Sequence, residues 1–280
     1  MLIFESIVSL QQYLKKKREN TSKIGFVPTM GALHEGHLAL LKQAKQENDL
    51  VVCSIYVNPT QFDNQEDLTH YPRTLAADTE KLKYIQCDVL FAPTNIEMYP
   101  TPSLVAFSFG HLDKVMEGQY RAGHFSGMAT VVAKFFNIVQ PDTAYFGQKD
   151  LQQYLIVDQL IKSLSFPIQL VRHPIVREAD GLAMSSRNRR LSPAQRAKAP
   201  KLYEALQLAA DWLPKAAIVE VKRRTQEFLL QAEGPKVEYF EIAHGHTLEA
   251  LTTYQPNTPT ALCIAAFLGD VRLIDNLLLH

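Results

Sequence analysis

Short apolar runs alternate with segments of helical hydrophobic spacing through the first two-thirds of the chain. The runs predict strands over residues 23–27, 50–57, 89–91, 103–109, 143–146 and 168–171. Apolar residues at helical spacing predict helices over 38–45, 75–84, 128–139 and 151–164. Such alternation is typical of a mostly parallel sheet covered by helices on both faces. The pattern therefore predicts an α/β fold with a Rossmann-like parallel sheet in its N-terminal part.

The pattern changes after about Arg172. Two long helical segments come first and three strand-like runs follow, at 193–212, 219–231, 237–242, 261–267 and 271–274. Strands that follow helices without alternation are typical of an α+β arrangement. We therefore expect two domains, a larger one over residues 1–173 and a smaller α+β domain over 174–280.

Composition adds mainly the classes of protein that it argues against. The 280 residues are 46% hydrophobic, enough to bury a substantial core. No apolar stretch approaches the roughly 20 residues that span a bilayer, and no basic segment with a long apolar core opens the chain. Cys53, Cys87 and Cys263 each lie inside an apolar run. We expect buried reduced thiols, no signal peptide, no membrane partner and a cytoplasmic location.

The formal net charge is zero, which argues against non-specific binding to nucleic acid. Residues 120–190 nevertheless carry nine Lys and Arg against five Asp and Glu. A solvated basic face would explain this excess as well as a site for an anion would.

The most informative segment is Pro28-Thr29-Met30-Gly31-Ala32-Leu33-His34-Glu35-Gly36-His37, between the first predicted strand and helix. A glycine-bearing loop here delivers two histidines to the start of a helix. Unpaired backbone N–H groups and the helix dipole favour an anion at such an end. Two imidazoles beside these donors suit a polyphosphate whose phosphorus is attacked.

Ordinary explanations compete with this interpretation. An isolated His-x-x-His is usually accidental, and each histidine alone is more often a core or surface residue. A zinc-protease motif is excluded, because it needs histidines four residues apart with a catalytic Glu between them. His34 and His37 are three apart across a glycine.

Three further loops carry polar side chains at predicted strand or domain ends. Gln61, in Asn58-Pro59-Thr60-Gln61-Phe62, offers an amide suited to hydroxyls and a carboxylate. Lys149 could neutralise a phosphate oxygen, and Gln153 lies one turn into the next helix. Residues 180–188 place two serines beside Arg187, which suits a phosphate. Taken singly, these segments are more often a proline turn, a helix cap at Asp150 and a surface turn.

The segment 121–127 mixes glycines with Arg121 and His124. It fits a flexible connection between elements. It also fits a mobile gate above an anionic ligand.

The strand, Pro-Thr-Met-Gly, His-Glu-Gly-His and helix together resemble the signature of the nucleotidyltransferase superfamily. The full set of motifs resembles the pantothenate synthetase family from end to end. The matching segments are PTMGALHEGH (28–37), SIYVNPTQF (54–62), YPRTL (71–75), GHFSGM (123–128), VQPDTAYFGQKDLQQ (139–153), DGLAMSSRN (180–188) and LIDN (273–276). Two positions depart from the pattern: Gln148 stands where Glu is expected, and Ser126 stands where Arg is frequent.

This resemblance implies a reaction of D-pantoate, β-alanine and ATP. The pantoate carboxylate would attack the α-phosphorus to give pantoyl adenylate and pyrophosphate. The β-alanine amine would then displace AMP and form pantothenate. The resemblance also implies Mg²⁺ bridging the phosphates, and a homodimer formed through the N-terminal domain.

The resemblance assigns roles by position. His37, His34 and Lys149 would be catalytic, with His37 as proton donor. Gln61 and Gln153 would bind pantoate, and Gln61 would also bind β-alanine. The ATP-binding residues would be Met30, Gly31, Ala32, Leu33, His34, Glu35, Gly36, His37, Gly147, Gln148, Lys149, Asp150, Val176, Met184, Ser185, Ser186 and Arg187. The resemblance identifies no residue as a metal ligand.

Two alternatives remain. A nucleotidyltransferase could use a phosphorylated acceptor, although paired Gln61 and Gln153 suit an uncharged diol-like acid better. A non-catalytic nucleotide sensor could retain the fold, but it would be expected to lose a histidine, Lys149 or the Ser-Ser-Arg loop.

Overall fold

A computed structural model describes residues 1–20, 22–63 and 65–279. The chain divides into two compact units. The first unit comprises residues 1–147 and 156–173, and the second comprises 148–155 and 174–280. Residues 148–155 therefore cluster with the second unit.

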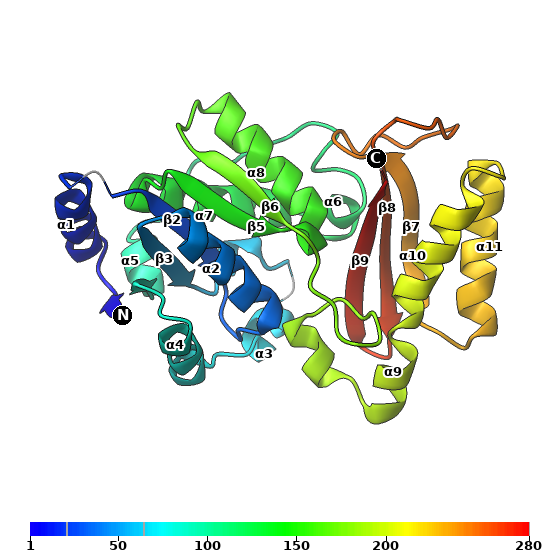
Figure 1. Cartoon of the computed structure of the whole chain (residues 1–280), viewed down its shortest axis with the longest axis horizontal. Coiled ribbons are helices and arrows are strands. Elements are labelled where there is room, and N and C mark those ends of the chain that lie inside the picture. Colours follow the sequence, from blue (N-terminus) through cyan, green and yellow to red (C-terminus); the bar gives the residue numbers. More distant parts are fainter. Residues whose placement is uncertain (21, 64, 280) are drawn as a thin grey trace. The chain divides into compact units, whose positions relative to one another are not determined.

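The described residues of the first unit form a six-stranded sheet in the order β1-β4-β3-β2-β5-β6 (Figure 1). Every neighbouring pair is parallel. The strands are β1 (Leu2–Phe4), β2 (Ile24–Thr29), β3 (Leu50–Ile55), β4 (Val89–Phe91), β5 (Thr143–Gly147) and β6 (Gln169–His173). The strand order reverses between β2 and β5. Ligands of open parallel sheets bind at the carboxyl ends of strands at such a point.

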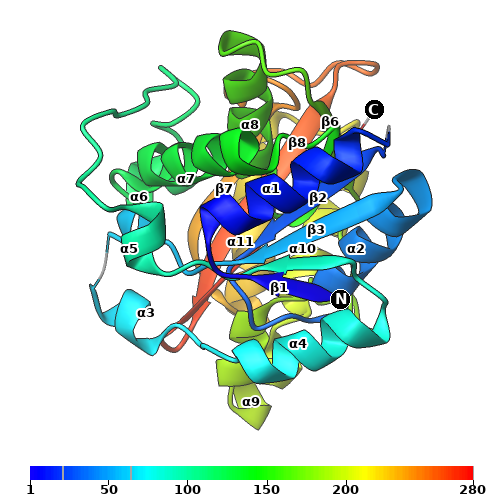
Figure 2. The ribbon, with the colours of Figure 1, turned by 90° about the vertical axis from the view of Figure 1, so that its left-hand side faces the viewer.

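Helices cover both faces of this sheet. The helices are α1 (Ile7–Arg18), α2 (Glu35–Glu47), α3 (Gln65–His70), α4 (Leu75–Tyr84), α5 (Asn95–Met98), α6 (Glu117–Tyr120), α7 (His124–Val139) and α8 (Leu151–Ser163), the last crossing the division between units. Helix α1 lies beside α7 (Figure 2). Helix α2 packs on β2, β3 and β5.

Side chains alternate between the two faces of the sheet, and each face has its own hydrophobic core. Phe135 of α7 is 3% exposed, and its ring lies 5.6 Å from that of Phe26 and 6.2 Å from that of Phe91. The next residue of β2, Val27, packs with Leu41 of α2 in the other core. Successive side chains of a strand point to opposite faces, so α2 and α7 cover opposite sides of the sheet.

The second unit contains an antiparallel sheet with the order β7-β8-β9. Its elements are α9 (Pro193–Lys198), α10 (Lys201–Trp212), α11 (Ile218–Gln231), β7 (Lys236–His244), β8 (Thr260–Leu268) and β9 (Val271–Leu279). Helices α10 and α11 pack against each other, α11 on β7 and α10 on β8 and β9 (Figure 1). These two sheets and their helices confirm the predicted α/β class with a smaller α+β part.

Several predicted elements were wrong. Residues 103–109 form no strand, and Leu104 is 98% exposed, because no described strand pairs with this apolar run. The predicted helix 193–212 is broken at Pro200, whose ring nitrogen cannot donate a helical hydrogen bond. The pattern also missed β1 and α1. Strand β1 has only three residues, and α1 buries only Leu10 and Leu14.

Cys53, Cys87 and Cys263 are buried thiols, as predicted. Burial raises the pKa of the Cys87 thiol to about 11, so this side chain stays protonated near neutral pH. Across the described helices, none combines the length and apolar character needed to cross a membrane.

Phe135→Ala should destabilise the protein by about 3–5 kcal/mol, because it leaves a cavity among three aromatic rings. Urea unfolding measures this change. Ile96→Ala, at an 81% exposed position, should change the free energy of unfolding by about 0.5 kcal/mol or less. Equal effects of the two substitutions would contradict the core described here.

Candidate active site

The turn between β2 and α2 holds the two histidines by their Nδ1 atoms. His34 is the N-cap of α2, and its Nδ1 accepts a hydrogen bond from the Gly36 N–H at 3.2 Å. The His37 Nδ1 accepts from the His34 N–H at 3.3 Å. Because both Nδ1 atoms act as acceptors, each neutral ring carries its proton on Nε2. The ring centroids are 4.1 Å apart, so the two rings form one donor cluster at a helix N-terminus.

A buried carboxylate holds the turn before these histidines. Asp78 of α4 is 1% exposed, and it accepts hydrogen bonds from the Ala32 and Leu33 N–H groups, both at 2.8 Å. The Thr74 hydroxyl donates to the same carboxylate at 2.9 Å. Gly31 has φ +83°, and a Cβ there would lie 3.2 Å from Asp78 Oδ2. The turn is therefore built around this carboxylate.

The loop after β3 meets the loop after β2 through Gln61. The Gln61 amide is 6% exposed and donates to the Met30 sulfur at 3.0 Å. Asn58, 1% exposed, donates to Gln61 Oε1 at 3.2 Å and to the Gly127 carbonyl at 3.1 Å. The Tyr99 hydroxyl donates to Asn58 Oδ1 at 3.0 Å. Asn58 therefore fixes the orientation of the Gln61 amide.

Helix α7 begins at His124, inside the segment 121–127 that the sequence suggested as a flexible connection or gate. The His124 ring donates from Nδ1 to the Gln61 carbonyl at 2.8 Å. A Cβ on Gly127 would lie 2.0 Å from the Thr60 carbonyl oxygen, so only glycine permits this close approach. The Ser126 hydroxyl, at the position where Arg was expected, accepts from the Phe107 N–H at 3.0 Å. The contacts of His124 and Gly127 tie the start of α7 to the loop after β3, and that of Ser126 ties it to residues 103–109.

In the second unit, one pocket is lined by Lys149, Ser185 and Arg187, together with Asp275 and neighbouring residues. The Lys149 ammonium lies 3.9 Å from the Asp150 carboxylate. Ser185 accepts a hydrogen bond from the Arg187 N–H at 3.2 Å and so caps the short helix 186–190. Its lining residues carry an ammonium, a hydroxyl and a guanidinium, groups that suit a phosphate, but its volume of about 10 Å³ admits only a water-sized molecule.

The segment leading to Ser185 folds back so that residues 176–177 pair with residues 183–184. The Met184 N–H donates to the Val176 carbonyl at 3.0 Å, and Arg177 and Ala183 form an isolated antiparallel bridge. Arg196 contacts the Asp180 carboxylate at 2.6 Å, and this hydrogen bond lowers the pKa of Asp180. These contacts define a short hairpin-like turn before the pocket.

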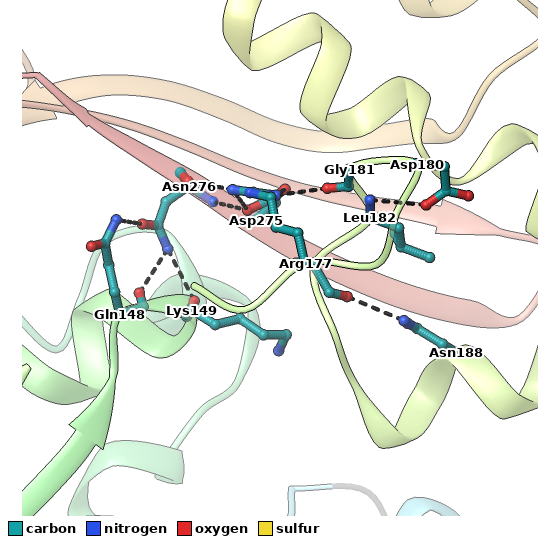
Figure 3. Close-up of polar contacts among 10 residues, drawn as sticks. Gln148, Lys149, Arg177, Asp180, Gly181, Leu182, Asn188, Asp275 and Asn276 are labelled. Carbon is teal, nitrogen blue, oxygen red and sulfur yellow. Dashed lines mark hydrogen bonds and ion pairs between the residues drawn. The ribbon is translucent and has the colours of Figure 1, made fainter. Parts of the chain in front are cut away.

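Contacts with β9 hold two segments beside this pocket, the one that leads to Ser185 and the one that bears Lys149 (Figure 3). Arg177 donates to both oxygens of Asp275, at 2.6 and 2.9 Å. Burial raises the pKa of the Asp275 carboxyl, and the Arg177 guanidinium opposes that shift. The Asn276 amide donates to the carbonyls of Gln148 and Lys149.

The predicted residues therefore fall into two groups. The first unit gathers Met30, His34, His37 and Gln61 at the carboxyl ends of β2 and β3, and Gly147 ends β5. The pocket of the second unit is lined by Lys149 and the Ser185–Arg187 loop. Gln153 is half-buried in the first turn of α8, within the second unit.

Sequence reasoning missed the residues that hold these groups in place. They are Asn58, Asp78, Arg177, Asp275 and Asn276. Asn58 and Asn276 lay within quoted motifs without an assigned role. Asp78 follows the quoted YPRTL segment by three residues. Among the described residues, no three His, Cys, Asp or Glu side chains gather as metal ligands.

Residues 2–278 match the family model described as pantoate-beta-alanine ligase. The pantothenate synthetase of Cytophaga hutchinsonii is 45% identical, covering 100% of this chain and 99% of that protein. A solved pantothenate synthetase from Thermus thermophilus is 42% identical, with a TM-score of 0.92 and 99% of each chain covered. A pantoate-beta-alanine ligase from Francisella tularensis, complexed with beta-gamma ATP and beta-alanine, is 36% identical with a TM-score of 0.83, covering 99% of this chain and 97% of that one.

The chain belongs to the pantoate–β-alanine ligase family. It is therefore an enzyme, a ligase of pantothenate formation. The His34–His37 turn and the segment at Lys149 both carry groups whose chemistry suits a phosphate.

Asp78→Ala should leave two buried backbone N–H groups without an acceptor, at a cost of about 1–3 kcal/mol each. We expect lower stability in urea and faster hydrogen exchange at the amides of Ala32 and Leu33. Glu80→Ala, an exposed position on the same helix, is the matched control and should change neither quantity. Unchanged exchange at both amides in Asp78→Ala would contradict the role of the carboxylate.

Proposed function

We propose that the chain condenses D-pantoate with β-alanine in two steps that consume ATP. The pantoate carboxylate attacks the α-phosphorus to form pantoyl adenylate and release pyrophosphate. The β-alanine amine then attacks the acyl carbon and releases AMP. The Francisella relative complexed with beta-gamma ATP and beta-alanine supports this pair of co-substrates. The observation that carries the proposal is the pair of Nε2–H donors at the start of α2.

The first step needs charge stabilisation rather than a base, because a carboxylate is already nucleophilic at neutral pH. We assign the Nε2–H groups of His34 and His37 to phosphate oxygens, with His37 as the proton donor to the phosphate that leaves. The Lys149 ammonium neutralises charge on the same phosphates. Each group is cationic or a donor, which is what charge developing on phosphoryl oxygens requires.

The remaining ATP contacts follow the same chemistry. In the β2–α2 turn the N–H groups of Ala32, Leu33, His34 and Gly36 already have acceptors within the protein, so this turn contributes its two imidazole Nε2–H groups at the helix N-terminus. Serine hydroxyls and the Arg187 guanidinium contribute hydrogen bonds from the second unit. The proposed set is Met30, Gly31, Ala32, Leu33, His34, Glu35, Gly36, His37, Gly147, Gln148, Lys149, Asp150, Val176, Met184, Ser185, Ser186 and Arg187.

For pantoate, we propose the amides of Gln61 and Gln153. An amide both donates and accepts, so it can bind the hydroxyls and the carboxylate of this acid. The contact from Asn58 supports Gln61 in this role, because it fixes which end of the amide donates. Gln61 also binds β-alanine in this proposal.

We propose that Mg²⁺ enters with ATP, bound mainly by phosphate oxygens, the hard ligands that this ion prefers. When bound, it would neutralise part of the triphosphate charge. We further propose that residues 1–173 bind nucleotide and pantoate and that residues 174–280 act as a lid. The three buried thiols are consistent with a cytoplasmic enzyme.

ATP–pyrophosphate exchange tests the proposal directly. Exchange should require pantoate and proceed without β-alanine. His37→Ala should lower the exchange rate about 10²–10³-fold, by loss of a donor to the transition state. His246→Ala, an exposed position in the second unit, should leave it unchanged. Exchange independent of pantoate, or unaffected by His37→Ala, would refute the proposed chemistry.

We also propose a homodimer formed through the first unit. Its support is the apolar segment 103–109, where Leu104 is 98% and Val105 is 64% exposed. Sedimentation should give twice the 31.6 kDa chain mass. Leu104→Glu should shift the protein toward monomer, whereas Leu230→Glu, at an 81% exposed position on α11, should not. A monomeric wild-type protein would refute this part.

A further inference from the structure

Two consecutive polar residues lie buried in the middle of β9. Asp275 is 4% exposed and Asn276 is 3% exposed. Leu273, two residues before Asp275, packs in the core of the second unit. Because side chains alternate along a strand, Asp275 shares the side of Leu273, and Asn276 lies on the opposite face. At these two positions the strand therefore presents a buried polar side chain to each of its two sides.

Asn276 contacts the segment that bears Lys149. Its amide nitrogen donates to the Gln148 carbonyl at 2.9 Å and to the Lys149 carbonyl at 3.0 Å. Its oxygen accepts from the Gln148 side chain at 3.2 Å. Both N–H bonds of the amide are thereby used on consecutive carbonyls (Figure 3). The two bonds donated by this buried amide hold the backbone at Gln148 and Lys149, and the bond that it accepts holds the Gln148 side chain.

Asp275 holds the segment on the other side. Its carboxylate receives both ends of the Arg177 guanidinium, which also donates to the Gly181 carbonyl at 3.0 Å. The guanidinium carbon lies 3.6 Å from the centre of the Tyr203 ring. A Cβ on Gly181 would lie 2.7 Å from that ring, so the turn packs tightly here. The turn that precedes Ser185 is thus fixed to the residue next to Asn276.

We propose that Asn276 is a positioning residue that sets the location of the Lys149 ammonium through the backbone of residues 148–149. Asp275 fixes the Arg177–Ala183 turn to the same point of β9. Strand β9 thereby holds both segments of the second unit that are proposed to bind phosphate. This inference rests on the proposed function of Lys149 at the phosphates.

Asn276→Asp tests the inference with almost no change in side-chain volume. The carboxylate has no donor for the two carbonyls, and its charge repels both oxygens. A side chain displaced by about 1 Å can cost about 100-fold in rate, so pantoate-dependent pyrophosphate exchange should fall by about that factor. Asn257→Asp, the same change at an exposed position of the second unit, is the control and should have no effect.

Hydrogen exchange gives a readout that does not depend on activity. Amides of residues 148–151 should exchange faster in Asn276→Asp, while those of α11 should stay as in the wild type. Asn276→Ser, small and neutral with one donor, should give intermediate rates and serves if Asn276→Asp does not fold. Wild-type exchange at 148–151 in the folded variants would overturn the inference.

A double-mutant cycle separates positioning from a general loss of stability. If Asn276 acts through Lys149, then Asn276→Asp should cost little further activity in a Lys149→Ala background. Multiplicative losses in the double variant would overturn the inference and leave the role of Lys149 intact. Full activity of Lys149→Ala alone would instead overturn the proposed role of Lys149, and the inference with it.

Discussion

The turn between β2 and α2, which carries both histidines, depends on the buried carboxylate of Asp78. This carboxylate accepts two consecutive backbone N–H groups, from Ala32 and Leu33, immediately before the His34 cap of α2. A buried donor without an acceptor costs about 1–3 kcal/mol, so this carboxylate removes alternative conformations of the turn. Backbone N–H groups of the same turn then orient both imidazole rings by donating to their Nδ1 atoms. The donors are therefore set before any substrate arrives, which is the condition for electrostatic stabilisation.

The same physical device recurs where other loops carry chemistry. The Asn58 amide donates hydrogen bonds to Gln61 and to the start of α7, and the Asn276 amide donates to the carbonyls of Gln148 and Lys149. Each of these side chains is short and nearly fully buried. A short side chain has few rotamers, and a buried polar group must find its partners. The groups assigned to substrate thus sit on backbones that neighbouring elements have immobilised.

Much of the first unit could be predicted because its signals are local. The apolar runs of β2, β3 and β5 and the spacing in α2 depend on neighbouring residues along the chain. Residues 103–109 have equally strong strand character, yet they form no strand, because pairing needs a partner that local pattern does not reveal. The start of α7 was missed for a related reason. Gly127 lowers helix propensity, but it lets the helix approach the Thr60 carbonyl.

The sequence by itself determined most of the sheet-forming strands, the histidine-bearing turn at the start of α2 and the family of the chain, because these depend on residue types at short spacings. Tertiary structure alone decided which buried residues hold those groups. Asp78 lies 45 positions from Leu33, and Asn276 lies 127 from Lys149. No period or motif relates such positions. Only folding brings a carboxylate or an amide to the backbone groups that it satisfies, because hydrogen bonds act over about 3 Å.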